Sequence, residues 1–241
     1  MADLNVESQN KVILASMNFT SISEQTFTTL LNKCTVHEQS SILKYKHRID
    51  QLRSLLAIIQ IKYCFKNYFN LEKDINIIKN PYGKPKVVGW SGDISISHTG
   101  DWIFTGICTT GRIGVDIECL NPFPLLKGTE ELFLSEKELS FFQANQNSEE
   151  SKDYLLTMWT LKEAYLKEIG IGLTMINPTS LSFNCPPKKS HFTYQGAKGI
   201  SELNTYNVDG VAKASVSTSS IKRPSIQFYK HYQNHMLAEM L

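Results

Sequence analysis

The predicted order of elements, in which a long helix is followed by several short strands, occurs twice along the 241 residues and constrains the fold most strongly. Residues 48–69 contain neither Gly nor Pro, and their apolar residues recur at three- and four-residue steps, which predicts a helix with one buried face. The capping box formed by Ser135 and Glu138 predicts the start of a shorter helix. A second long helix is predicted over 152–169, with Gly170 as its stop.

Short segments of apolar residues bounded by turn residues predict the strands. After the first helix they are 93–97, 102–108 and 112–118, which we expect to form an antiparallel meander; later ones are 180–183, 191–194, 203–208, 211–216 and 225–232. The last of these is expected to cover a sheet edge. No residue-level repeat is evident, but the repeated order predicts an α+β fold of two similar halves, 1–117 and 118–241.

The composition excludes several classes of protein. A hydrophobic fraction of 41% supports a buried core, and a net charge of +2 is too small to favour nucleic acid as a partner. The sequence shows neither the pattern of a signal peptide nor a membrane span, so we expect a cytoplasmic protein. Five scattered cysteines without a CxxC pair argue against a disulfide framework and against a zinc site.

The segment GVDIE at 114–118 places two carboxylates on one strand. Alternate side chains of a strand share a face, so Asp116 and Glu118 point the same way, with Cα atoms roughly 7 Å apart. Like charges at this spacing repel, and a hard cation with oxygen ligands, such as the Mg²⁺ of phosphate chemistry, would remove the conflict. A plain surface strand with the same two acids is the alternative.

The segment WTLKEAYLK at 159–167 supplies further charged groups on the second long helix. Glu163 and Lys167 are neighbours at i and i+4, an arrangement that a simple surface ion pair also explains. Trp159 is more typical of a core than of a ligand platform. Two upstream segments have features that suit anions: a constrained turn around Lys84, and a strand end with Ser97, His98 and a glycine.

Four segments in this order resemble the 4′-phosphopantetheinyl transferases, specifically the larger, surfactin-synthetase-activating (Sfp-type) branch. They are NPYGKP at 80–85, SISHTG at 95–100, GVDIE at 114–118 and WTLKEAYLK at 159–167. The resemblance covers about residues 43–175. It implies a monomeric pseudo-dimer of two α+β halves, with the active site in the cleft between them.

By this resemblance, the protein transfers the 4′-phosphopantetheine arm of coenzyme A to a serine of an apo acyl or peptidyl carrier protein, and releases adenosine 3′,5′-bisphosphate. The resemblance implies that Mg²⁺, or Mn²⁺, is bound by Asp116, Glu118 and Glu163. It implies ligand contacts for the remaining site residues: Lys167 at the pyrophosphate with Lys162 beside it, Lys84, Ser97 and His98 at the 3′-phosphate and nearby groups, Gly83 and Pro85 in the adenine-side turn, and Arg53 at the adenosine end.

The same resemblance assigns the coenzyme A side to residues 1–117 and the metal helix with carrier docking to 118–241. An apolar run at 123–126 and the helix at 136–144 are the candidate docking patch, with core packing as the alternative. Two other functions stay open. One is a catalytically inactive module of the same fold that binds coenzyme A or carrier proteins, and the other is an unrelated Mg²⁺-dependent phosphohydrolase.

Overall fold

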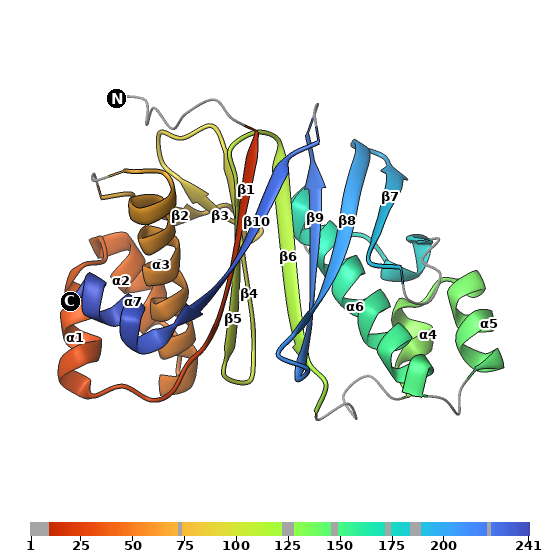
Figure 1. Ribbon diagram of the computed structural model, residues 1–241, viewed down its shortest axis with the longest axis horizontal. Coiled ribbons are helices and arrows are strands. Elements are labelled where there is room, and N and C mark those ends of the chain that lie inside the picture. Colours follow the sequence, from red (N-terminus) through yellow and green to blue (C-terminus); the bar gives the residue numbers. More distant parts are fainter. Residues whose placement is uncertain are drawn as a thin grey trace. The chain divides into compact units, whose positions relative to one another are not determined.

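The chain is built from two units, each of which combines a four-stranded sheet with a helix of 21 residues (Figure 1). The computed structural model describes residues 10–71, 74–121, 128–145, 149–171, 175–183, 189–220 and 223–241. Unit 1 comprises residues 1–111 together with 222–241, and unit 2 comprises 112–221. The predicted α+β class is confirmed.

The sheet of unit 1 has the strand order β10-β1-β5-β4. Its strands are β1 (Lys11–Asn18), β4 (Asp93–Thr99), β5 (Trp102–Cys108) and β10 (Ser225–Tyr232). β1 runs antiparallel to β5 and parallel to β10, which is therefore the edge strand that we predicted. Helix α7 (Gln233–Met240) follows β10.

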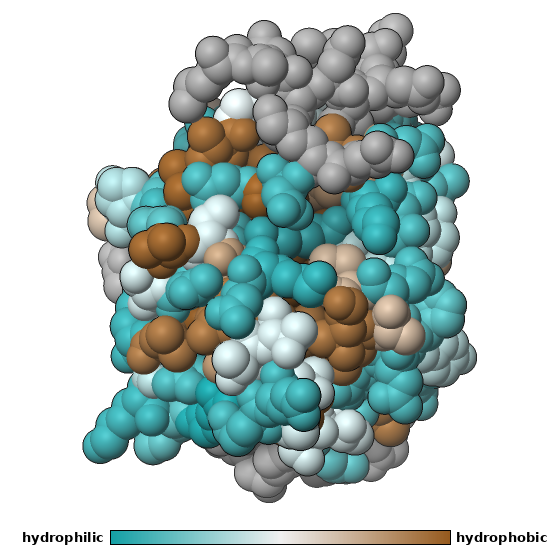
Figure 2. Space-filling model, turned by 90° about the vertical axis from the view of Figure 1, so that its left-hand side faces the viewer, coloured by the Kyte–Doolittle hydropathy of each residue, from teal (hydrophilic) through white to brown (hydrophobic). Residues whose placement is uncertain are grey.

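Helix α3 (Arg48–Tyr68) is the long helix of unit 1 and confirms the predicted position. Its side chains from Leu55 to Phe65 are all buried, so the middle of the helix is enclosed on every side rather than on one face. The other elements of this unit are α1 (Glu24–Asn32), α2 (Val36–Leu43) and the hairpin strands β2 (Ile77–Lys79) and β3 (Pro85–Val87). On the face shown in Figure 2, apolar patches alternate with polar ones. Val36 of α2 is one exposed apolar residue of this unit, at 80%.

The sheet of unit 2 is antiparallel throughout, with the strand order β6-β9-β8-β7. Its strands are β6 (Arg112–Cys119), β7 (His191–Gly196), β8 (Gly199–Val208) and β9 (Ala212–Ser219). Its helices are α4 (Glu130–Phe133), α5 (Glu136–Ala144), α6 (Glu149–Ile169) and the short 3₁₀ helix η2 (Pro178–Ser180). The capping box at the start of α5 and the stop of α6 at Gly170, with φ of +74°, agree with the prediction.

Three details differ from the predictions. β6 does not continue a meander from β5; it pairs with β9 and opens the second sheet. Residues 180–183 do not form a strand, because the Leu181 carbonyl and the Phe183 amide bond to side chains. The units also divide the chain at other points than 117/118, since residues 222–241 return to unit 1. The functional assignments of the two halves stay predictions.

None of the helices in the described part of the chain combines the length and the apolar character required to cross a lipid bilayer.

Candidate functional site

Gly114 allows β6 to pack directly on α6. A Cβ atom at this position would lie 1.8 Å from the carbonyl oxygen of Ala164 and 2.3 Å from the amide nitrogen of Glu168. Both are backbone atoms of α6, so no side-chain movement could relieve the clash. The glycine of the GVDIE segment therefore sets the close approach that brings Asp116 to the helix carrying Glu163 and Lys167.

Asp116 and Lys167 form the central contact of this crossing. The Lys167 Nζ donates a hydrogen bond to Asp116 Oδ1 at 2.7 Å, and Asp116 is only 3% exposed. Burial alone would lower the pKa of Lys167, but the neighbouring carboxylates of Asp116 and Glu163 outweigh it, so that the pKa is raised. Lys167 is therefore held in its charged form. Its partner Asp116 is buried, so the contact is not the simple surface ion pair that the sequence also allowed.

Glu163 faces the same group of charges from α6. Burial, together with the charges of Asp116 and Glu118, raises the pKa of its carboxyl to about 7, while the charge of Lys167 opposes this rise. This is the carboxylate repulsion that the sequence predicted, now shared among residues of two elements. A group that titrates near neutral pH can take up a proton or, when ionised, bind a cation.

The donor set suits Mg²⁺, because Asp116, Glu118 and Glu163 offer only oxygen atoms. Mg²⁺ commonly uses one or two protein carboxylates and completes its shell with water and phosphate oxygens. Within the described residues, no three His, Cys, Asp or Glu side chains are grouped closely enough to hold a metal ion by themselves. The Lys167 ammonium is hydrogen-bonded to Asp116 in this arrangement. The magnesium site stays a prediction.

Residues that the sequence analysis did not single out hold β9 and α6 together behind these acids. Ser215 lies opposite Asp116 on β9, and its hydroxyl is 2.7 Å from that of Thr160, one turn before Glu163. Ser217, two residues along β9, donates a 2.6 Å hydrogen bond to the fully buried Glu168. Small hydroxyl residues at alternate positions of a buried strand are the sequence signal for such contacts.

Lys162 does not occupy the position that we predicted for it. Its ammonium lies in a buried cluster of four oxygen acceptors, among them the carboxylate of Glu138 at 2.6 Å. The side chain is 1% exposed and leaves α6 away from Glu163, because successive residues of a helix point about 100° apart. Lys162 therefore has a structural role in this protein, and not the role beside the pyrophosphate that we predicted. Trp159 is partly buried and packs edge-on against Phe133 of the core.

In unit 1, the predicted turn at 80–85 joins β2 to β3. The Asn80 side chain accepts hydrogen bonds from the amides of Tyr82 and Lys84, and Gly83 adopts φ of +87°, which favours glycine. Pro85 begins β3. The Lys84 ammonium forms an ion pair with Asp93 at the start of β4.

Ser97 and His98 lie at the opposite end of β4 from Asp93. At about 3.3 Å per residue, the Cα atoms of Asp93 and His98 are roughly 17 Å apart. With the Lys84 ammonium at Asp93, Lys84 and His98 do not converge on one phosphate group. The arrangement suits two separate groups of an extended ligand.

Ser97 is buried and His98 is exposed. Arg53 donates two hydrogen bonds to the carbonyl of Gly100, at 3.0 and 2.8 Å, and one to Asp50. Arg53 thus fixes the turn that follows His98, and its predicted contact at the adenosine end stays a prediction.

The predicted docking patch is only partly described. The run at 123–126 lies outside the described residues, while α5 confirms the predicted helix at 136–144. Phe141 of α5 is 37% exposed and packs on Tyr154 of α6, with ring centroids 4.7 Å apart. Docking of a partner at α5 stays a prediction.

Known proteins are similar to the part of the chain in which β6 crosses α6. The profile of the 4′-phosphopantetheinyl transferase superfamily matches residues 112–212. A 4′-phosphopantetheinyl transferase of Bacillus subtilis, ffp, is 29% identical over 64% of this chain and 68% of its own. The enzyme gsp of Aneurinibacillus migulanus is 32% identical, and Sfp of Bacillus subtilis is 31% identical; the matches cover 62% and 58% of those proteins.

A strand with two acids that crosses a helix with a Lys-Glu pair thus lies within the region that these proteins share. The chain is similar to the 4′-phosphopantetheinyl transferase superfamily over residues 112–212, and the relatives that it resembles include Sfp and gsp. It spans about three fifths to two thirds of the length of the three relatives. A solved holo-[acyl-carrier-protein] synthase of Thermotoga maritima aligns over 47% of this chain and 66% of its own at 22% identity, with a TM-score of 0.32 that is too low to support a conclusion.

Proposed function

We propose that the protein transfers the 4′-phosphopantetheine group of coenzyme A to a serine hydroxyl of an apo acyl or peptidyl carrier protein. The observation that carries this proposal is the meeting of Asp116, Glu163 and Lys167 where β6 crosses α6. The names of the relatives in the superfamily support it. We further propose that the protein acts as a monomer in the cytoplasm.

In the proposed reaction, the serine oxygen forms a bond to the β-phosphorus of coenzyme A. The bond from this phosphorus to the bridging oxygen of the pyrophosphate breaks, and adenosine 3′,5′-bisphosphate leaves. A Mg²⁺ ion bound by Asp116, Glu118 and Glu163 would supply electrostatic stabilisation of the charge that develops on the pyrophosphate. Lys167 adds a fixed positive charge beside the same group, which its raised pKa keeps protonated.

Glu163 is the residue that we assign to the serine proton. Among the three predicted acidic ligands, Glu163 is the one on helix α6, whereas Asp116 and Glu118 lie on strand β6. Asp116 is already engaged, because its Oδ1 accepts a hydrogen bond from Lys167. The proton therefore moves from the serine hydroxyl to the carboxylate of Glu163.

The docking of the carrier protein is proposed at α5, together with the run at 123–126 that the sequence predicted. Leu132 of α4 and Phe141 of α5 are exposed apolar side chains in this part of unit 2, at 70% and 37%. Exposed apolar groups flanked by charged residues such as Glu136 and Lys137 are typical of protein-binding surfaces.

One assay separates the proposed function from its alternatives. The full chain is incubated with Mg²⁺, coenzyme A and several apo carrier proteins, and the intact masses of the carriers are measured. A mass increase of one phosphopantetheine group is the expected result. Binding of coenzyme A by calorimetry without any mass increase would favour the inactive binding module, and release of inorganic phosphate would favour a phosphohydrolase.

A further inference from the structure

Lys162 is the residue directly before Glu163, yet its surroundings differ completely. Its Nζ lies within hydrogen-bond distance of Glu138 Oε2 and of the carbonyl oxygens of Phe133, Pro178 and Leu181, at 2.6 to 3.0 Å. An ammonium has three N–H donors, so these four acceptors engage all of them. Lys162 therefore has no donor left for a ligand.

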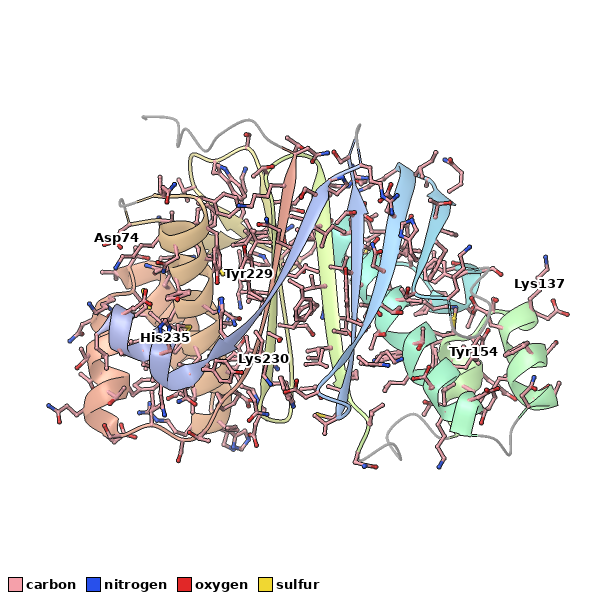
Figure 3. The ribbon with its side chains drawn as sticks, viewed as in Figure 1. Asp74, Lys137, Tyr154, Tyr229, Lys230 and His235 are labelled. Carbon is pink, nitrogen blue, oxygen red and sulfur yellow. The ribbon has the colours of Figure 1, made fainter. Side chains whose placement is uncertain are left out.

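Glu138 is the acidic residue of this cluster, and it accepts several hydrogen bonds. Its carboxylate accepts a hydrogen bond from the amide of Ser135 at 2.8 Å, and this bond caps the start of α5. It also accepts hydrogen bonds from the amide of Phe183, at 2.7 Å, and from the ammonium of Lys162. The preceding residue of α5, Lys137, is exposed to solvent (Figure 3), whereas Glu138 is 2% exposed. One buried ion pair thus ties α6 to the end of α4, the start of α5 and the segment around η2.

The same device occurs in unit 1. Glu38 accepts the amides of Thr35 and Ile77, both at 2.8 Å, and pairs with Lys62 of α3 at 3.0 Å. Lys62 also donates to the carbonyl of Lys33, as Lys162 does to that of Phe133. The glutamate precedes the lysine by 24 residues in both units. This Glu–Lys pair is the residue-level repeat that the sequence analysis did not reveal. Each of the two long helices carries the lysine of one copy.

Unit 1 provides an internal control for the role of the pair. The residues that follow Lys62 at the distances where Glu163 and Lys167 follow Lys162 are Tyr63 and Asn67. α3 therefore keeps the Glu–Lys device without the charged residues of the candidate site. The device is common to both units because it holds a long helix in place, and not because it binds a ligand.

We propose that Lys162 and Glu138 are positioning residues for Glu163 and Lys167. Because the pair anchors α6 on one side, it fixes the rotation and the axial position of the helix, and thereby the place where Glu163 and Lys167 face Asp116. The inference rests on the proposed function for its kinetic consequence only. Its structural part concerns the order of α6 and needs no substrate.

The matched variants Lys162→Met and Lys62→Met test this proposal. Each leaves a buried carboxylate without its lysine, so both should lower the melting temperature by a similar amount, about 10 °C. Amide hydrogen exchange, measured well below both melting temperatures, should become at least tenfold faster over residues 163–167 in Lys162→Met only. Unchanged exchange at these residues in Lys162→Met would overturn the proposal, as would an equal effect of Lys62→Met.

Binding of coenzyme A by calorimetry, with and without Mg²⁺, distinguishes positioning from direct ligand contact. Lys162→Met should weaken the Mg²⁺-dependent part of the affinity at least tenfold, and Lys62→Met less than twofold. An equal loss without the metal ion would mean that Lys162 contacts the ligand, and would refute the proposal. If wild-type protein modifies no carrier protein, the proposed function fails, whereas the exchange measurement still decides the positioning role.

Lys162→Arg serves if Lys162→Met does not fold. It keeps the positive charge, but a planar guanidinium cannot direct its donors to the same four converging acceptors. We expect faster exchange over 163–167 again, by a smaller factor, with the melting temperature closer to that of the wild type. Wild-type exchange in a folded Lys162→Arg protein would also count against the positioning role.

Discussion

Lys167 and Asp116 are 51 residues apart in the chain, and a hydrogen bond of 2.7 Å between Nζ and Oδ1 joins them. This contact unites the strand segment GVDIE with the helix segment WTLKEAYLK. The contact places the ammonium of Lys167 beside the carboxylate of Asp116 at the crossing of β6 and α6. Such an arrangement of fixed charges can contribute to catalysis.

Glu163→Gln should abolish transfer while the fold is retained. The amide cannot accept the serine proton, so turnover should fall at least 100-fold. If Glu163 acts as a base, the affinities for Mg²⁺ and coenzyme A fall much less than turnover does. Calorimetry and an intact-mass rate assay on the same preparation compare the two losses. A loss of affinity that accounts for the whole loss of turnover would leave Glu163 as a metal ligand only.

Gly114→Ala should separate β6 from α6. The added methyl group meets backbone atoms of Ala164 and Glu168, so we expect a loss of about 3 kcal/mol in the free energy of unfolding by urea. Transfer activity should fall with it, because Asp116 moves away from Lys167. Gly210→Ala is the control: its φ of +68° strains alanine by about 1–2 kcal/mol, but nothing lies within 4 Å. Full activity in Gly114→Ala would contradict the role given to this glycine.

His98→Ala and Lys167→Met should affect different groups of coenzyme A. If His98 holds the 3′-phosphate, His98→Ala weakens binding of coenzyme A about tenfold and leaves dephospho-coenzyme A unaffected. Lys167→Met should weaken both, because both contain the pyrophosphate. Lys152→Met, at an exposed position of the same helix, controls for loss of charge. Equal effects of His98→Ala on both ligands would remove His98 from the phosphate site.

His231 should make unit 1 sensitive to acid. The imidazole is 7% exposed and lies between Tyr68 and Gln60, and Tyr229 of the same strand stacks on Tyr68. Burial, with a smaller effect of His235, lowers the pKa of His231 from 6.5 to about 4. The folded state therefore binds its proton less readily than the unfolded state, and stability is lost as the pH falls from 6.5 towards 4.

Between pH 7.5 and pH 5, this group should cost about 2 kcal/mol of unfolding free energy. Urea unfolding of His231→Gln should show a pH dependence that is smaller by this amount. His235→Gln, at a side chain that is 71% exposed, should keep most of the wild-type dependence. Identical pH profiles for the wild type and His231→Gln would refute the assignment.

Local patterns predicted most of the helices and strands. The gap in Gly and Pro over 48–69 and the capping box at Ser135 depend on neighbours in the chain, and α3 and α5 lie where they were expected. Pairing between distant segments was harder to predict. The parallel register of β1 with β10 joins residues more than 200 positions apart, and no local signal places β6 beside β9 instead of β5.

The candidate site shows the same division. Alternation along a strand put Asp116 and Glu118 on one face, and the helical repeat put Glu163 near Lys167. Lys162 points towards the buried carboxylate of Glu138. The spacing of residues in the sequence did not indicate that these two side chains would meet. The contact of Arg53 with the backbone carbonyl of Gly100 was not predicted for a similar reason, because side-chain patterns do not reveal a backbone acceptor.

The pairing of β10 with β1 also affects the order in which the two units can fold during synthesis. Unit 2 is continuous in sequence, so it can fold soon after residue 221 leaves the ribosome. Unit 1 begins to emerge first but finishes last, because the outer edge of β1 gains its partner only when residues 225–232 have been translated. Until then the nascent chain carries an open strand edge in unit 1, which makes this interval the time of greatest risk of misassembly.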